Sequence, residues 1–205
     1  NIKSISQTQK LVKNIKQLDK NCYYSNYGPL YKKAQKEVLK FFRIKKNTVV
    51  FSSSGDAALN AIYIYLKKNN PKKKFIITPA YNFYSGINSI IRSGFEPIFV
   101  DINLDNFLIM EDQLSFLFKK YKNKVAAINY VSPHGFPLDI KRLNWIKKKY
   151  NIPIVYDAAD AFINFDKNLD KSNFFITSSF HPTKNLPANE SGLKIFKKNL
   201  EKKFQ

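Results

Sequence analysis

Cysteine is nearly absent from this sequence. Cys22 is the only cysteine among 205 residues, so no internal disulfide can form. Long apolar runs are missing too: no stretch is long enough to span a bilayer, and no secretory signal is visible. These absences argue against a disulfide-stabilised secreted protein and against helical membrane spans. We therefore expect a cytoplasmic protein that has no membrane partner.

Acidic residues and arginine are also scarce. Asp and Glu total 15 against 35 Lys and Arg, which gives a net charge of +20. Such a charge is typical of nucleic-acid binders, but arginine contributes only Arg43, Arg92 and Arg142. The lysines lie in short runs between apolar segments, Asn, Ile and Phe are abundant as well, and no nucleic-acid-binding signature is present. We expect a general attraction for anionic ligands and no nucleic-acid partner.

What the chain does contain is the composition of a globular domain, with 44% hydrophobic and 15% aromatic residues. It has no internal repeat and no low-complexity linker, which suggests one domain or a large part of one. Apolar runs alternate with amphipathic segments, and this pattern predicts an α/β fold: three layers, with a mostly parallel sheet covered by helices on both faces. The predicted strands are residues 49–51, 75–77, 97–100, 125–128, 153–156, 174–176 and 192–196; the predicted helices are 29–42, one from 56 onward, 83–93, 111–121 and 138–150, after a weakly helical segment at 5–18.

Ligands of such a fold gather at the carboxyl ends of the strands. The first candidate there is Ser52-Ser53-Ser54-Gly55, which precedes a predicted helix. The free N–H groups at a helix start suit a phosphate, and serine hydroxyls add donors. The same serines would also serve as an ordinary helix cap. Both interpretations stay open on these residues alone.

The second candidate is Asp157, which closes an apolar strand and is followed by small residues. A carboxylate in such a position needs a cation or several hydrogen-bond donors. Asp157 would either cap the following turn or pair with the protonated ring nitrogen of a cofactor.

The third candidate is Lys184, in a Pro-containing loop that follows the apolar run Phe174-Phe175-Ile176. Among so many lysines, an arbitrary one is a solvated surface charge. A lysine held against the core differs, because desolvation favours the free amine, which is a nucleophile for an aldehyde. An amine for an aldehyde, a carboxylate for a pyridinium and a loop for a phosphate are together the parts that hold pyridoxal phosphate.

From about Asn26 to its end, the chain resembles the DegT/StrS family of pyridoxal-phosphate-dependent sugar aminotransferases, which have the fold type I architecture. The resemblance rests on a set of short motifs: Ser54-Gly55-Asp56-Ala57-Ala58-Leu59, Pro79-Ala80-Tyr81-Asn82-Phe83, Glu96-Pro97-Ile98-Phe99-Val100-Asp101, Asp157-Ala158-Ala159-Asp160-Ala161, Ser179-Phe180-His181-Pro182-Thr183-Lys184-Asn185-Leu186 and Asn189-Glu190-Ser191-Gly192. The Lys-Asn-Leu element after Ser-Phe is the most specific of them.

The resemblance implies a role for each matching residue. Lys184 would bind the cofactor covalently and later transfer the proton, and Asp157 would keep the pyridine nitrogen protonated. Phe83 would stack on the ring. The remaining implied cofactor contacts are Ser54, Gly55, Asp56 and Ser179 around the phosphate and Asp160 at the ring hydroxyl, with no metal.

Some positions depart from the family pattern. Position 56 is usually Thr, and Asp56 brings a negative charge near the phosphate, so a side-chain role there is in doubt. Position 160 is commonly Gln, and an ionised Asp160 has no donor. The family often has His where this chain has Ser132, while His134 stands nearer the usual aromatic position.

The resemblance further implies a cofactor-binding large domain over residues 1–205, with a helical segment at 1–45 and the α/β core at 46–205. Family members continue past the lysine into a smaller domain, which we expect to be absent here. The segment alone is therefore expected to bind the cofactor without efficient turnover.

The implied function is transfer of an amino group to a nucleotide-linked keto-sugar for surface polysaccharide synthesis. Glutamate is the expected donor, and a homodimer is the expected form of the complete protein. Two alternatives remain open. One is a cofactor-binding module without turnover. The other is a sugar dehydratase of the same family, against which Lys184 argues because those enzymes typically have His there.

Overall fold

The structure, a computed structural model, describes residues 8–136, 139–162, 174–188 and 190–204. Its centre is a seven-stranded sheet in the order β1-β7-β6-β5-β4-β2-β3. The strands are β1 (Asn47–Ser52), β2 (Phe75–Pro79), β3 (Glu96–Val100), β4 (Val125–Val131), β5 (Ile154–Asp157), β6 (Phe175–Ser179) and β7 (Gly192–Lys197).

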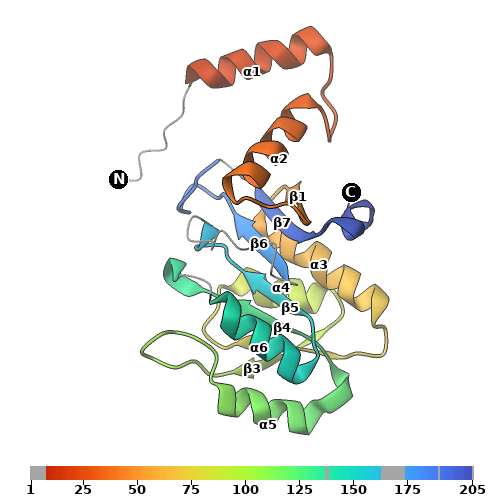
Figure 1. Cartoon of the computed structure of the whole chain (residues 1–205), viewed down its shortest axis with the longest axis vertical. Coiled ribbons are helices and arrows are strands. Elements are labelled where there is room, and N and C mark those ends of the chain that lie inside the picture. The colour runs from red at the N-terminus through yellow and green to blue at the C-terminus, as the bar shows by residue number, and fades with distance from the viewer. Residues whose placement is uncertain (1–7, 137–138, 163–173, 189, 205) are drawn as a thin grey trace.

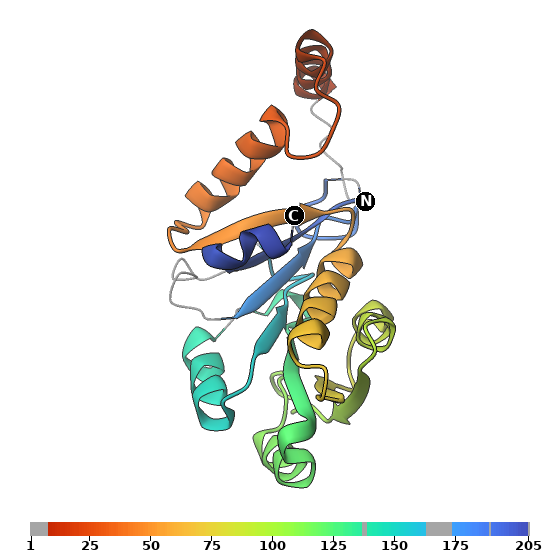
Figure 2. The same cartoon turned by 90° about the vertical axis from the view of Figure 1, so that its right-hand side faces the viewer.

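Helices cover both faces of this sheet, as Figures 1 and 2 show. One apolar cluster joins the sheet to α3 and α4, and the other joins its opposite face to α5 and α6. The helices are α1 (Thr8–Asn21), α2 (Pro29–Phe41), α3 (Gly55–Asn69), α4 (Tyr84–Arg92), α5 (Glu111–Tyr121) and α6 (Ile140–Tyr150), with short 3-10 turns η1 (Lys122–Lys124), η2 (Pro133–Gly135) and η5 (Lys198–Lys203). The predicted three-layer α/β fold with a mostly parallel sheet is therefore confirmed.

The direction of β7 is the main feature that the strand pattern did not indicate. β2 is parallel to β3 and β4, and β4, β5 and β6 are parallel in succession. β7 instead runs antiparallel to both of its neighbours, β6 and β1. As a result the start of β7 lies at the same edge of the sheet as the carboxyl ends of β1, β5 and β6.

The local sequence explains where the elements begin. The strands are apolar nearly throughout because both of their faces are covered. Pro29 opens α2, where its missing N–H costs nothing. Ser54 caps α3 by accepting the N–H of Ala57, and Asp139 caps α6 by accepting the N–H of Arg142. These caps fix the strand-to-helix turns at the edge that holds the candidate residues.

Several predicted features fall partly outside the described residues, namely the helix starts at 5 and 138 and the Asn189 landmark. In the part of the chain that the structure describes, no helix has the length and apolarity needed to cross a membrane.

Candidate functional site

A cavity of about 830 Å³ opens at the sheet edge where β1, β5 and β6 end. It is lined by every residue of the predicted set, which the structure thus brings together: Ser54, Gly55, Asp56, Phe83, Asp157, Asp160, Ser179 and Lys184. Parallel strands explain the convergence, because their carboxyl ends lie at one edge.

Three backbone segments meet closely on one side of this cavity. Gly192, at the start of β7, pairs with both Ser52 and Ser179, the last residues of β1 and β6. A Cβ on Gly192 would overlap the backbone between Ser54 and Gly55, and a Cβ on Gly55 would lie 2.8 Å from the Ser179 Cβ. Only glycine fits at either position. We call this arrangement of Ser54, Gly55, Ser179 and Gly192 the glycine cup.

The glycine cup lies at the N-terminus of α3, which is a favourable place for an anion. The first N–H groups of a helix have no intrahelical acceptor, and the helix dipole is positive there. The Ser54 hydroxyl accepts the Ala57 N–H at 3.1 Å, so that N–H is used by the cap, while the Ser54 O–H can still donate. The cup therefore offers this O–H and the backbone N–H groups of Gly55 and Asp56, which precede Ala57 in the first turn.

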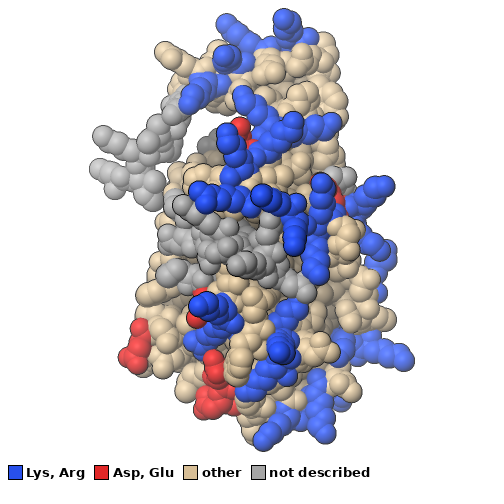
Figure 3. Space-filling view, in the orientation of Figure 1, with Lys and Arg blue, Asp and Glu red and all other residues tan. Residues whose placement is uncertain are grey.

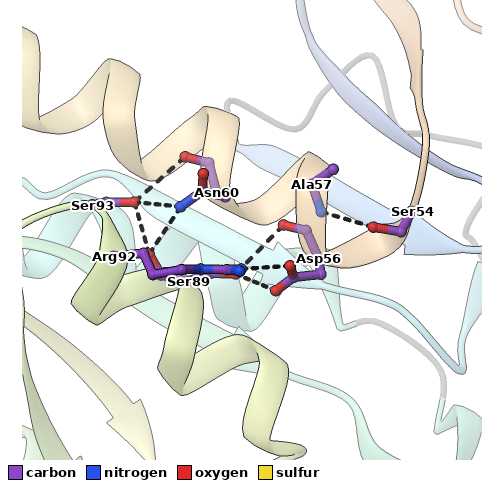
Figure 4. A network of polar contacts seen from close by, with 7 residues as sticks. All are labelled: Ser54, Asp56, Ala57, Asn60, Ser89, Arg92 and Ser93. Atoms are coloured by element: carbon purple, nitrogen blue, oxygen red, sulfur yellow. Dashed lines mark hydrogen bonds and ion pairs between the residues drawn. The ribbon is translucent and has the colours of Figure 1, made fainter.

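Asp56 lies in this first turn, but its carboxylate is held by α4. The Ser89 hydroxyl donates to Oδ1 at 2.7 Å, and the Arg92 guanidinium forms an ion pair with Oδ2, as Figure 4 shows. The negative charge that this position introduces is thus paired with a positive one. A phosphate in the cup would meet the Asp56 backbone beside a neutralised side chain.

The contact between Asp56 and Arg92 belongs to a polar seam that holds α3 against α4 (Figure 4). Ser93 donates to the Ser89 carbonyl at 2.7 Å, and the Asn60 amide donates to the Ser93 hydroxyl at 3.0 Å. These contacts were not predicted from the sequence. A signal for them was present, because Ser89 and Arg92 are polar residues spaced by three and therefore lie on one face of a short helix.

Asp157 ends β5 deep in the cavity, with 7% of its surface exposed. Its Oδ1 accepts the Ala159 N–H at 3.1 Å. Burial raises the pKa of Asp157 to about 6, and the nearby carboxylate of Asp160 acts in the same direction. Asp157 therefore caps a turn, as one interpretation held, and it is also a buried carboxyl group that a cationic ligand atom would stabilise in its charged form.

Lys184 reaches the same cavity from the loop after β6, and its side chain is 21% exposed. The Lys184 Nζ donates to Asp160 Oδ1 at 2.7 Å. The loop is fixed by the Lys184 N–H, which donates to the His181 carbonyl, and by the Asn185 amide, which donates to the Asp160 carbonyl. Asp160 thus orients the lysine in this structure, which is a different contact from the ring hydroxyl that the family pattern implies.

Phe83 stands at the start of α4 with 63% of its surface exposed. The Lys184 Nζ lies 5.9 Å from its ring centroid. An exposed aromatic face beside a lysine suits a flat ligand, because covering the ring removes apolar surface from water.

The mouth of the cavity carries polar contacts between loops. The Tyr81 hydroxyl lies 2.8 Å from Nε2 of His134, and Nε2 of His181 lies 3.2 Å from the Glu190 carboxylate. Ser132, buried behind this rim, also lines the cavity. Within the described ranges, no cluster of His, Cys, Asp and Glu is suited to hold a metal ion.

The sequence is similar to that of curated sugar transaminases. A dTDP-4-amino-4,6-dideoxy-D-glucose transaminase of Shigella dysenteriae is 26% identical over 174 residues, which is 84% of this chain and 45% of the relative. The Escherichia coli protein of the same name is 23% identical over 163 residues, 79% of this chain and 42% of its own. The chain therefore spans less than half the length of these curated relatives.

Solved structures share the fold. A putative PLP-dependent aminotransferase from Bacillus cereus superposes with a TM-score of 0.82 at 24% identity, over 90% of this chain and 50% of its own. NtdA from Bacillus subtilis, solved with bound cofactor PMP, gives a TM-score of 0.79 at 22% identity, over 95% of this chain and 43% of its own. The family model for the DegT/DnrJ/EryC1/StrS aminotransferases matches residues 6–204, nearly the whole sequence. The resemblance seen in the motifs is thereby confirmed, and the chain belongs to the DegT/DnrJ/EryC1/StrS aminotransferase family.

Proposed function

We propose that this chain forms the pyridoxal-phosphate site of an aminotransferase that acts on a nucleotide-linked keto-sugar. The observation that carries the proposal is the arrangement of Asp157, Lys184 and the glycine cup around one cavity. Family membership and the transaminase names of the curated relatives support the same reaction class.

The residues present fit the cofactor on structural grounds. Ser54, Gly55 and Ser179 of the glycine cup line the cavity at the start of α3, where the first N–H groups of the helix suit a phosphate. Asp157 is a buried carboxyl group that accepts one backbone N–H and has no ion-pair partner among the described residues, and a protonated ring nitrogen would give it a cationic partner. Lys184 supplies an amine at the same cavity, and Phe83 supplies an exposed aromatic face.

When bound, pyridoxal phosphate supplies an aldehyde for covalent attachment and a ring that withdraws electrons from the carbon losing its proton. The chain's own groups then have distinct tasks. The amine of Lys184 would hold the cofactor covalently by condensing with its aldehyde, with loss of water, and once free again would serve as the base that carries the proton. The carboxylate of Asp157 holds the ring nitrogen in its charged form.

The remaining groups would position the Lys184 amine and the ligand and keep water away from them. Asp160 accepts a hydrogen bond from the Lys184 Nζ, and this contact keeps the amine directed into the cavity. Phe83, which lines the cavity with an exposed aromatic face, would pack against a flat ligand and exclude water from it. The backbone N–H groups of the cup bind the phosphate and so fix the ring's orientation.

The substrate class and biological setting are also part of the proposal. The curated relatives are named for a dTDP-linked amino sugar, and a neighbour of similar fold was solved with its TDP-sugar product. We infer that the amino acceptor here is a nucleotide-linked keto-sugar, with glutamate as the donor, in surface polysaccharide synthesis. A homodimer is the proposed assembly of the complete protein and the cytoplasm its proposed location. Lys184 disfavours the sugar dehydratase alternative.

Single-turnover transfer tests the proposal. The chain is loaded with pyridoxamine 5′-phosphate and given the 4-keto counterpart of dTDP-4-amino-4,6-dideoxy-D-glucose, and the amino sugar is measured by mass spectrometry. We expect product from the wild type and none from Lys184→Ala, which keeps the cavity but lacks the amine. Stoichiometric cofactor makes even slow transfer measurable. Tight cofactor binding without product would contradict the transfer reaction and favour a binding module.

A further inference from the structure

Lys194 is a buried lysine in the middle of β7, with only 4% of its surface exposed. Its strand neighbours Leu193 and Ile195 face the core that packs on α5 and α6. Because side chains alternate along a strand, Lys194 faces the opposite side, which α3 covers. Lysine is rarely fully buried, since removing its charge from water is costly unless it is compensated. Its position therefore requires a physical reason.

Compensation from the protein is incomplete. The Lys194 Nζ donates to the Ser52 hydroxyl at 2.8 Å. Among the residues with described positions, no carboxylate lies within ion-pair distance of it. Burial lowers the pKa of Lys194 to about 8. The described hydrogen-bond partner of the Lys194 ammonium is thus a neutral hydroxyl, whereas a buried ammonium is ordinarily paired with an anion.

The direction of the side chain identifies where an anion would lie. Ser52 is the last residue of β1 and leads into Ser54 and Gly55 of the glycine cup. Ser52 also pairs with Gly192, whose backbone abuts that turn. The Lys194 ammonium group therefore lies next to the cup on the α3 side of the sheet, and it is not part of the cavity lining. The positive end of the α3 dipole lies at the same place, and two like charges there are unfavourable until an anion binds.

The polar character of this face continues toward Asp157. In the sheet, Lys194 pairs with Thr177, and Thr177 pairs with Asp157. The Thr177 hydroxyl is buried and has no hydrogen-bond partner among the described residues. Unpaired buried polar atoms reduce stability. The unpaired Thr177 hydroxyl and the incompletely compensated Lys194 ammonium are therefore costly for the ligand-free protein, as expected of groups that serve a bound ligand.

We propose that Lys194 places a buried positive charge behind the glycine cup and so increases the affinity for the phosphate group of the ligand. This inference rests on the function proposed above. Lys194 does not line the cavity, and it acts through its electric field, which is weakly screened in the protein interior. The proposal gives Lys194 opposite effects in two measurements: it stabilises the phosphate complex and destabilises the ligand-free protein.

The test compares two ligands that differ only in the phosphate, pyridoxamine 5′-phosphate and pyridoxamine. Neither carries an aldehyde, so the many surface lysines do not react with them. Calorimetry gives the Kd of each ligand for the wild type, for Lys194→Met, and for Lys197→Met, an exposed position on the same strand with an equal change of net charge. Thermal unfolding of the ligand-free proteins gives the second measurement.

We expect Lys194→Met to reduce the preference for the phosphorylated ligand by about tenfold or more, with pyridoxamine affinity nearly unchanged. The Tm of the ligand-free variant should equal or exceed that of the wild type, because a buried charge is removed. Lys197→Met should match the wild type both in its preference for the phosphorylated ligand and in its Tm. Lys194→Gln, which keeps a donor for Ser52, serves if the Met variant does not fold.

An unchanged phosphate preference in the Lys194 variants, beside a clear preference in the wild type, would overturn this inference and leave the proposed function intact. A wild type that binds neither ligand, or binds both equally, would overturn the proposed function and this inference with it. A loss of affinity for both ligands alike would show a purely structural role and would also overturn the inference.

Discussion

At the scale of single residues, the candidate site depends on a few side chains whose environment differs from water. Asp157 is the clearest case, because a carboxyl group that is 7% exposed accepts only one described hydrogen bond, from Ala159. Burial raises its pKa to about 6 from an ordinary value of 3.8. Burial thus shifts the equilibrium of Asp157 toward its protonated form in the ligand-free protein, and a bound cation would shift it back toward the carboxylate.

Asp157 should therefore make the ligand-free protein less stable as the pH rises. Its pKa is higher in the folded than in the unfolded state, so its contribution is fully present below about pH 4 and is lost as the pH passes through about 6. Between pH 4 and 7 the free energy of unfolding should fall by roughly 3 kcal/mol because of this group. Asp157→Asn should remove that slope in denaturant titrations. Asp105→Asn, at an exposed position, should keep it. An unchanged slope in Asp157→Asn would contradict the assignment.

At the scale of elements, the glycine cup exists because β7 runs against the turn between β1 and α3. Gly192 and Gly55 permit an approach that no other residue allows. The seam of Asp56, Ser89 and Arg92 then fixes α4 beside the same turn. Three separate parts of the sequence thus shape the one position that we propose for the phosphate.

Gly192→Ala should disrupt the cup, because the added Cβ overlaps backbone atoms of Ser54 and Gly55, which cannot move away as a side chain can. We expect a loss of about 1–3 kcal/mol in the free energy of unfolding and weaker binding of pyridoxamine 5′-phosphate. Gly86→Ala is the matched control, since its Cβ would meet only the end of the Asn82 side chain. Equal behaviour of the two variants in urea titrations and calorimetry would refute the close approach.

Arg92→Met should leave the Asp56 carboxylate without its positive partner beside the proposed phosphate position, although the Ser89 hydroxyl would still donate to it. We expect the affinity for pyridoxamine 5′-phosphate to fall by roughly tenfold. The double variant Asp56→Asn/Arg92→Met should recover most of that loss, because the repelling charge is gone. Calorimetry on this double-mutant cycle measures the coupling, and strictly additive effects would show that the pair does not influence the cup.

Particular residues show how much of this arrangement the sequence could predict. The strand ends at Asp157 and Ser179 were predictable, because apolar runs mark the strands and parallel strands bring their ends together. The antiparallel orientation of β7 was not predictable, because an apolar run does not indicate in which direction its strand lies in the sheet. The pairing of Asp56 with Arg92 and the burial of Lys194 were not predicted, because both depend on contacts between segments that lie far apart in the sequence.

At the scale of the whole molecule, the N-terminal helices differ in how they join the core. α1 stands apart from the sheet in Figures 1 and 2 and buries no residue. α2 packs Val38 and Leu39 against the core, and the residues that follow it, Phe42 and Ile44, are buried. Positive side chains are spread over the face shown in Figure 3, across α1 and α2 and around the lower helices, without forming a single stripe.

Two truncations should separate the contributions of these helices. Deleting residues 1–21 should leave the Tm nearly unchanged, because α1, the described helix of this segment, contains no buried residue. Deleting residues 1–45 removes Phe42 and Ile44, which are 2% and 7% exposed, and should destabilise the protein by several kcal/mol, since losing one large buried side chain costs about 2–5 kcal/mol. Thermal unfolding distinguishes the two. Equal Tm values would show that α2 and its following turn add nothing to the core.

The central claim is that Lys184 is the residue that binds the cofactor, and covalent mapping tests it most directly. The chain is incubated with pyridoxal phosphate, reduced with borohydride, digested and analysed by mass spectrometry. We expect the phosphopyridoxyl group chiefly on the peptide that contains Lys184, and its loss in Lys184→Arg, which keeps the positive charge. A label spread over surface lysines, equal in the wild type and in Lys184→Arg, would contradict the account.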